Sequence, residues 1–296
     1  MRADMADGDG EPGGLSAPTA VRMVLGSQLH RFREAAGITP DEAARRIRAS
    51  RSKISRMELG RVGFKKRDVE DLLTLYGVTG AETRSAVVSL VAEANAAGWW
   101  NQHGDVAPGW FEPYLGLESA ASVIRDFELQ FVPGLFQTKD YARAVALLGP
   151  AGLPGEETEH RISLRLKRQE LLARPDPPRI WAILDEGVLR RPIGGRPVMR
   201  TQVTRLAEVA ALPHVTLQVV PFGRSGRAAV GGSFSVLRFH DADVPDVVYI
   251  GQIASALYLD KREDVELYIE VMDRLGATAL TPPQTQRFLG QILDET

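Results

Sequence analysis

Cationic and hydroxyl side chains gather on one face of a short segment near residue 53 of this 296-residue chain. Arginine can donate two hydrogen bonds to guanine, and a serine hydroxyl reaches base edges or phosphate oxygens. Because Ile54 and Met57 fall on the opposite side of a helical wheel, this face would point outward. The sequence therefore predicts nucleic-acid contacts from Arg51, Ser52, Lys53, Ser55 and Arg56, and contacts to the phosphate backbone from Lys65 and Lys66.

The formal charge is distributed unevenly along the chain. Residues 21–80 contain thirteen Lys or Arg and seven Asp or Glu, so they carry +6 within a chain whose total is −2, and the remainder must carry −8. A basic module on an acidic body suggests that one part alone contacts a polyanion. A solvated basic face without such a partner is the alternative reading of the charge.

Two helices are predicted at the start of the basic region. Apolar residues at helical spacing give a first helix that stops at Gly37. Thr39, Pro40 and Glu42 then match an N-cap, a first-turn proline and a capping box for a second helix of about nine residues.

Two further helices would complete this region. Ser50 can cap a third helix that runs through Leu59, and Gly60 can close it in a left-handed conformation. A fourth helix is expected over residues 66–76, where the apolar positions that would pack against the other helices are Val69, Leu72 and Leu73.

Residues 25–78 resemble the Cro/C1-type (XRE) helix-turn-helix family, through LGSQLHRFREAAG at 25–37 and SKISRMELG at 52–60. The resemblance implies a sequence-specific DNA-binding transcriptional regulator. A homodimer on double-stranded DNA is expected, because one small module seldom supplies enough specific affinity. A helical bundle that binds protein instead of DNA is the alternative.

The chain departs from this family at two positions. The family commonly has Gln at the first residue of the second helix, where this chain has Pro40, so the phosphate contact of that Gln is in doubt. Its frequent glycine in the turn between the helices is replaced by Arg48, which would need a left-handed or adjusted backbone at a cost on the order of 1 kcal/mol.

Strand and helix patterns mix beyond residue 110. Segments of strand length are rich in β-branched residues, and longer segments have helical spacing. The predicted strands are 179–184, 215–220, 233–239 and 247–250, with an apolar run over 123–131. The predicted helices are 138–148, 157–172, 200–211, 262–275 and 283–293.

The expected fold class is an all-α helix-turn-helix N-terminal domain plus an α+β (mixed α/β) C-terminal domain. We expect a disordered tail over residues 1–20, the helix-turn-helix domain over 21–80, a helical linker over 81–109 and the C-terminal domain over 110–296. Around the linker, aromatic side chains crowd one segment, and core packing is favoured over a ligand site for Trp99, Trp100, Trp110, Phe111 and Tyr114.

The C-terminal region resembles the domain of unknown function DUF5753, which follows such modules in many actinobacterial regulators. The resemblance implies developmental or antibiotic gene control, often beside a small acidic companion protein of the DUF397 type, and it implies no catalytic residue. The phrases that carry it are YLGLESAA at 114–121, FVPGLFQT at 131–138, DYAR at 140–143, RLKRQ at 165–169, DEGVLRR at 185–191 and VVPF at 219–222.

No catalytic, metal or cofactor motif stands out. Five histidines are scattered and cysteine is absent, so no zinc set is completed. The glycines at 194–195 and 231–232 lack the phosphate-loop ending, and the adjacent acids Asp185 and Glu186 are typical of a helix start. The N-terminus has no secretory signal and no apolar run is long enough to span a membrane. We expect a cytoplasmic protein that is not an enzyme and needs no cofactor.

A ligand or partner surface is predicted around the turn at Pro133 and Gly134, although structural pairing inside the domain is the alternative. The leading hypothesis is a dimeric regulator whose C-terminal domain senses a ligand or partner. The alternative is an antitoxin-like interaction protein that binds the small acidic companion and regulates its own gene. The residues predicted for the ligand or partner surface are Glu118, Arg125, Gln137 and Tyr141.

Overall fold

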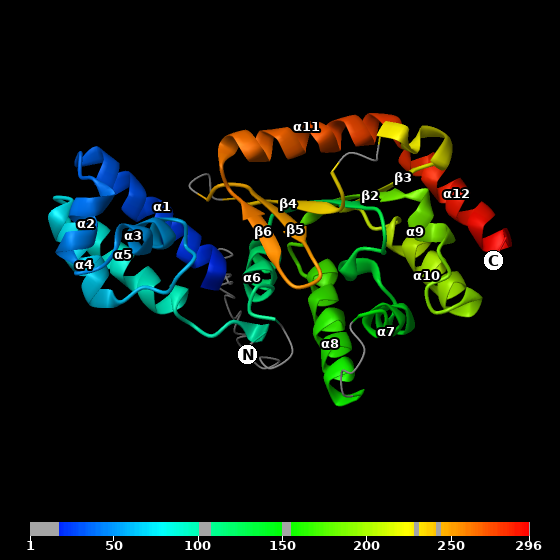
Figure 1. Cartoon of the computed structure of the whole chain (residues 1–296), viewed down its shortest axis with the longest axis horizontal. Coiled ribbons are helices and arrows are strands. Elements are labelled where there is room, and N and C mark those ends of the chain that lie inside the picture. Colours follow the sequence, from blue (N-terminus) through cyan, green and yellow to red (C-terminus); the bar gives the residue numbers. More distant parts are fainter. Residues whose placement is uncertain (1–17, 101–107, 150–154, 228–230, 241–243, 296) are drawn as a thin grey trace, which may run out of the picture. The chain divides into compact units, whose positions relative to one another are not determined.

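The computed structural model describes residues 18–100, 108–149, 155–227, 231–240 and 244–295 (Figure 1). The chain divides into two compact units, Met1–Ala96 and Ala97–Thr296. Most of the predicted tail, residues 1–17, lies outside the described residues. Residues 18–20 already belong to the first helix, which begins earlier than its apolar spacing suggested.

The first unit is helical throughout its regular elements. Between α2 and α3 the chain makes the tight turn expected of a helix-turn-helix, and α2 spans seven residues because the chain leaves the helix at Ile47. The helices are α1 (Pro18–Ala35), α2 (Pro40–Arg46), α3 (Arg51–Glu58), α4 (Lys66–Leu75) and α5 (Ala81–Ala94).

Side-chain caps set the start of both central helices, as predicted. The Oγ1 of Thr39 accepts a hydrogen bond from the backbone N–H of Glu42 at 3.3 Å, and the Glu42 carboxylate accepts one from the backbone N–H of Thr39 at 2.8 Å. The Oγ of Ser50 accepts from the backbone N–H of Lys53 at 3.1 Å. These bonds satisfy amide groups that a helix N-terminus otherwise leaves unpaired.

The helix α5, which we expected to act as a linker, belongs to the first unit. Its apolar side chains Val87, Val91 and Ala94 lie in one core with those of α1, α3 and α4. The periodicity identified the helix, whereas its packing depends on contacts with α1 that sequence spacing does not report. Close packing of α1 on α3 also requires Gly26, since a Cβ there would lie 2.4 Å from the carbonyl oxygen of Met57.

The second unit contains a six-stranded mixed sheet in the order β3-β2-β1-β4-β5-β6. β1, β2 and β3 are parallel neighbours, whereas β4, β5 and β6 join antiparallel. The predicted strand segments are confirmed, and only the short edge strand β6 was missed. The strands are β1 (Val123–Glu128), β2 (Arg179–Asp185), β3 (Val215–Val220), β4 (Phe234–Arg238), β5 (Val247–Gly251) and β6 (Ala256–Leu259).

Helices cover both faces of this sheet, which confirms the α+β class. α11 lies along one face, and α6 and α8 lie on the other (Figure 1). The α-helices are α6 (Glu112–Ala120), α7 (Lys139–Leu147), α8 (Gly155–Arg168), α9 (Glu186–Arg190), α10 (Arg196–Val209), α11 (Arg262–Thr278) and α12 (Pro282–Glu295). The 3-10 helices are η2 (Gly134–Phe136), η3 (Gln169–Ala173) and η4 (Phe222–Arg227).

Strand β1 presents different chemistry to the two faces, because successive side chains of a strand alternate. Phe127 packs in the core under α11, and Arg125 pairs with Asp273 of α11 at 3.3 Å. Asp126 and Glu128 point to the opposite face, where α6 and α8 lie, and both line a cavity there.

The turn between α2 and α3 contains the one backbone outlier. Arg48 has a φ of 53°, and it is the only non-glycine residue with positive φ in the part of the chain that the structure describes. The expectation of a left-handed backbone at this position is therefore confirmed. Its Cβ makes this conformation costly, whereas glycine adopts it freely.

We predict that Arg48→Gly raises the free energy of unfolding by about 1 kcal/mol relative to Arg48→Ala. Both substitutions remove the same exposed charge, but only glycine relieves the strain at positive φ. Urea unfolding of the full chain, followed by circular dichroism, measures the difference. Equal stability of the two variants would contradict the assignment of strain to this residue.

Candidate functional site

The outer face of α3 carries the predicted nucleic-acid contacts. Arg51, Ser52, Ser55 and Arg56 are exposed, whereas Ile54 and Met57 on the inner side are each 1% exposed. The Nε of Arg56 donates a hydrogen bond to the carbonyl oxygen of Ser52 at 3.3 Å, so its guanidinium lies along the helix surface. The division into an apolar and a polar face is as predicted, and the contacts to DNA stay a prediction.

A buried polar network, which the sequence did not reveal, fixes α3 against α1. The guanidinium of Arg33 donates from Nε to one Glu58 oxygen at 2.6 Å and from a terminal nitrogen to the other at 2.9 Å. Arg33 also donates to the carbonyl oxygen of Ile38, and the Glu58 carboxylate lies 2.8 Å from a ring nitrogen of His30. Hydrogen bonding to Glu58 raises the pKa of Arg33. These contacts join the end of α3 to α1.

Lys53 differs from the other predicted contacts. Its Nζ lies 2.6 Å from the carboxylate of Asp68, and its side chain is only partly exposed. The pair joins α3 to the first turn of α4. Lys53 therefore faces a protein carboxylate in this structure.

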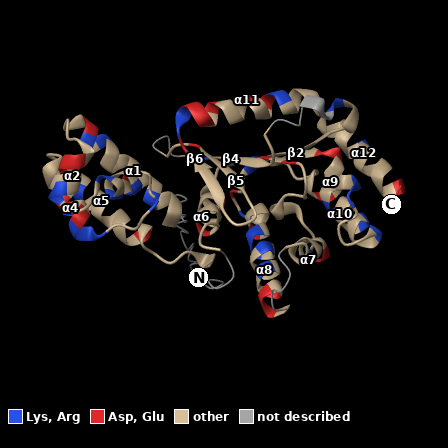
Figure 2. Cartoon of the chain, viewed as in Figure 1, with Lys and Arg blue, Asp and Glu red and all other residues tan. Residues whose placement is uncertain are grey.

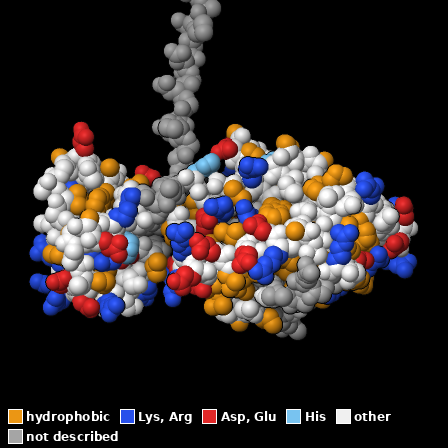
Figure 3. Space-filling model, turned by 90° about the horizontal axis from the view of Figure 1, so that it is seen from above, with side chains coloured by type: hydrophobic (Ala, Val, Ile, Leu, Met, Phe, Trp, Pro, Cys, Tyr) orange, Lys and Arg blue, Asp and Glu red, His pale blue; other side chains and the backbone are white. Residues whose placement is uncertain are grey.

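The start of α4 carries the two lysines that were predicted to contact the phosphate backbone of the nucleic acid. Lys65 precedes the helix and Lys66 is its first residue, and both are exposed. Amide groups at a helix N-terminus and nearby cations suit phosphate oxygens. Figure 2 shows Lys and Arg at α4 of the first unit, whereas Figure 3 shows acidic and basic side chains intermixed over the visible face of the second unit.

The predicted ligand surface of the second unit does not form one cluster. Arg125 lies on the α11 face of the sheet, stacks on Trp181 at 5.4 Å and pairs with Asp273, away from the side where Asp126 lines a cavity. Arg125 therefore lies apart from the other predicted residues, because the apolar run did not show which of two adjacent residues faces which side of the sheet. Its part in a ligand or partner surface stays a prediction.

The other three members are buried and used in internal contacts. The Tyr141 hydroxyl accepts from the backbone N–H of Val132 at 3.2 Å, and its side chain is fully buried. Gln137 donates to the carbonyl oxygen of Val132 at 2.7 Å. Glu118 is 2% exposed and pairs with an arginine. Tyr141 therefore makes an internal contact, which was the alternative to a ligand or partner surface. Glu118 and Gln137 also line a cavity.

The partner of Glu118 is Arg168, the last residue of α8. Two nitrogens of Arg168 donate to the two carboxylate oxygens at 2.6 and 2.7 Å. The guanidinium also lies over the rings of Phe111 and Tyr114, at 5.3 and 5.4 Å. A Cβ at Gly134 would lie 3.1 Å from it, so this glycine makes room for the arginine.

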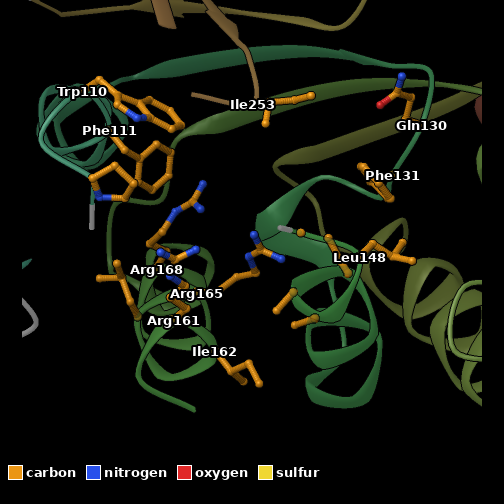
Figure 4. Close-up of a pocket in the computed structure, with 16 residues that line it drawn as sticks. Trp110, Phe111, Gln130, Phe131, Leu148, Arg161, Ile162, Arg165, Arg168 and Ile253 are labelled. Atoms are coloured by element: carbon orange, nitrogen blue, oxygen red, sulfur yellow. The ribbon is translucent and has the colours of Figure 1, made fainter. Parts of the chain in front are cut away.

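A cavity of about 800 Å³ opens beside this ion pair (Figure 4). Trp110 and Phe111 line one side, and Phe131 and Leu148 line another. Trp110 and Phe111 thus line a cavity, although the sequence favoured core packing over a ligand site for them. Trp100 packs in a core with α6 and α8, as predicted. The charged lining residues all come from α8 and are Arg161, Arg165 and Arg168.

A smaller cavity of about 200 Å³ shares part of this lining and adds acidic groups. Burial raises the pKa of Asp126 to about 6 and that of Glu128 to about 8. The Oδ1 of Asp126 is buried and has no hydrogen-bond partner among the described residues. The alternation along β1 could have indicated that Asp126 and Glu128 share a face, but not that α8 brings arginines beside them.

Asp185 and Glu186 have the structural role that their sequence indicated. Asp185 caps α9 by accepting from the backbone N–H of Gly187 at 2.8 Å, and Glu186 accepts from Arg190 and from the backbone N–H of Phe222. Within the described ranges, no helix is long and apolar enough to cross a membrane, and no group of three His, Cys, Asp or Glu is placed to hold a metal ion.

The two units match two known families. The α1–α5 unit, with its capped α2 and α3, defines a helix-turn-helix protein, and residues 24–86 match a helix-turn-helix domain profile. Residues 111–291 match the domain of unknown function DUF5753. The chain belongs to the DUF5753 family, since this match covers more than half of it. Comparisons with curated proteins and with solved structures gave no match.

We predict that Glu128→Gln flattens the dependence of stability on pH. The carboxyl has a pKa of about 8 in the folded chain and about 4.3 when unfolded, so the folded state holds its proton more tightly. Its stabilising contribution is complete below about pH 4.3 and is lost as the pH rises to about 8. Gln cannot ionise, so the variant should lose less stability over this range.

Urea unfolding at a series of pH values checks this expectation. Glu263→Gln on the exposed surface of α11 is the matched control, and it should keep the pH dependence of the unmodified chain. If the free energy of unfolding changes equally with pH in Glu128→Gln and in the unmodified chain, the Glu128 carboxyl does not have a raised pKa.

Proposed function

We propose that this protein is a sequence-specific DNA-binding transcriptional regulator that acts in the cytoplasm as a homodimer. The observation that carries the proposal is the exposed face of α3, where arginines and serines lie opposite a fully buried apolar side. Each subunit would place α3 in one of two successive major grooves, about one helical turn apart. The Arg33–Glu58 network supports this role, because base readout requires a rigidly held helix.

We propose that the second unit senses a ligand or partner and is not an enzyme. The adjacent acids Asp185 and Glu186, which the sequence singled out, are engaged in helix capping and internal hydrogen bonds. The larger cavity is lined by apolar side chains and arginines, a composition typical of binding sites. Binding there would change how the dimer holds DNA.

An interaction protein with an acidic companion is the second candidate. Exposed apolar side chains on the second unit favour it, since large apolar residues at the surface often mark contacts with other proteins. These residues are Leu147 and Leu148 at the end of α7, and Ile253 and Leu257 around β6. A stoichiometric small protein that copurifies from the native host would support this candidate, and its absence would favour the sensor.

Arg56→Ala should weaken binding to the operator by about 1 to 3 kcal/mol, because it removes a base contact. Selection of bound DNA from a random pool with the purified protein supplies the operator, and gel shifts at matched salt measure the affinity. Arg262→Ala removes an exposed arginine of the second unit and serves as the control. Unchanged affinity for Arg56→Ala would remove this residue from the interface.

Lys66→Gln should weaken binding to all sequences equally and lower the slope of log affinity against log salt by about one. This outcome differs from that of Arg56→Ala, which should relax sequence preference at one position. A Lys66→Gln variant with an unchanged salt slope would show that this ammonium group does not contact a phosphate.

Light scattering of the full chain should give twice the mass of one chain, both free and on the operator. The expectation follows from the limited affinity of one small module and from the symmetry of operators that carry two half-sites. A single chain on the operator at concentrations that saturate binding would contradict the dimeric arrangement.

A further inference from the structure

Three arginines of α8 lie along one side of the larger cavity. Arg161, Arg165 and Arg168 are separated by four and three residues, so one face of the helix carries all of them. Figure 4 shows their side chains extending toward the space between Phe111 and Leu148. Two of the three are neutralised by carboxylates, and one is not.

The first and the last of these arginines, Arg161 and Arg168, have carboxylate partners. Arg168 is held by both oxygens of Glu118, and Arg161 pairs with Glu157 of the same helix at 2.8 Å. Arg165 instead donates to the neutral Oε1 of Gln137 at 2.9 Å. No carboxylate among the described residues lies within ion-pair distance of Arg165.

The surroundings of Arg165 disfavour its positive charge. Burial and the neighbouring charges of Arg168 and Arg161 lower its pKa to about 10. An arginine stays protonated at neutral pH even so, which leaves a largely buried cation without a counter-ion. Such a charge is costly unless it is paired, so an anion beside it would be bound strongly.

Among the described residues, no carboxylate of the adjoining smaller cavity pairs with Arg165. Glu118 is already engaged by Arg168. Burial raises the pKa of Glu128 to about 8, so this carboxyl is mostly neutral at neutral pH. Asp126 is hydrogen-bonded by Ser235 and interacts electrostatically with Arg168.

The rest of the larger cavity suits an apolar body. Among the described residues, no Asp or Glu lines it, and its walls include Trp110, Phe111 and Phe131 together with Ile162 and Leu164. Its volume of about 800 Å³ falls in the range of small-molecule sites, which combine apolar walls with a few polar anchors.

We propose that this cavity binds a small organic anion, with an apolar or aromatic body against the walls and one carboxylate, sulfonate or phosphate group paired with Arg165. The proposal rests on the sensor role proposed for the second unit and names the chemical class of its ligand. The shared requirement is one anionic group on an otherwise apolar molecule.

Two fluorescent probes with the same ring system test the proposal on the full chain. 8-Anilinonaphthalene-1-sulfonate carries one sulfonate, and N-phenyl-1-naphthylamine lacks it. We expect the anionic probe to bind with one site per chain and at least tenfold more tightly than the neutral one, because a charge-assisted pair adds to the apolar contact. Equal binding of both probes would overturn the role of the charge.

Variants locate the probe within the cavity. Arg165→Gln should weaken the anionic probe by about tenfold and leave the neutral probe unchanged, because only the charge is lost. Lys167→Gln removes a cation from the exposed side of the same helix and should change neither. Ala146→Trp fills the cavity from α7 and should abolish binding of both probes. Unchanged binding of the anionic probe to Arg165→Gln or to a folded Ala146→Trp variant would overturn the site.

The same variants separate this inference from the proposed regulatory function. Operator affinity is measured with and without the anionic probe. Probe binding that depends on Arg165 supports the site even if operator affinity does not change, and in that case only the sensor role fails. Operator binding without any probe binding overturns the site and leaves the DNA-binding function standing.

Discussion

The buried ion pair between Arg168 and Glu118 determines how the second unit is built around its cavity. Removing two charges from water costs several kcal/mol for each ion, so such a pair persists only with excellent geometry. Here both carboxylate oxygens accept hydrogen bonds, and two aromatic rings flank the guanidinium. The pair therefore joins α6, which carries Glu118, to the end of α8, which carries Arg168. Arginines of α8 form part of the cavity wall, so this joint sets the position of that wall. Loss of either partner would leave an uncompensated buried charge, at a cost of about 3 to 5 kcal/mol.

Features governed by neighbouring residues could be predicted from the sequence. The capping box at Thr39 and the cap at Ser50 depend on a few adjacent residues, whereas the left-handed turn at Arg48 was expected from the family resemblance. The strands of the sheet other than β6 were also identified, because β-branched runs between turns are local patterns. The outward face of α3 followed from the position of Ile54 and Met57 on a helical wheel.

Features governed by distant contacts could not be predicted. Arg125 and Asp126 are adjacent in sequence, yet they face opposite sides of the sheet, and only the register of β1 decides which side each takes. The arginines of α8 were visible in the sequence as part of a family phrase. The sequence does not show which of these arginines has a carboxylate partner. Glu118 pairs with Arg168 from fifty residues away, and a carboxylate can pair with another of them only where the fold brings the two together.

If the protein is the regulator proposed above, the Lys53–Asp68 pair affects its binding to non-specific DNA. An ammonium already neutralised by its own chain releases fewer counter-ions from DNA than a free one, so the indiscriminate part of the attraction is weaker than the number of basic residues indicates. A regulator must dissociate quickly from the large excess of non-specific sites. A smaller positive charge shortens the time that the protein stays bound at each of them. Under the proposed function, the neighbouring arginines and serines of α3 would supply the contacts that distinguish the operator from other sequences.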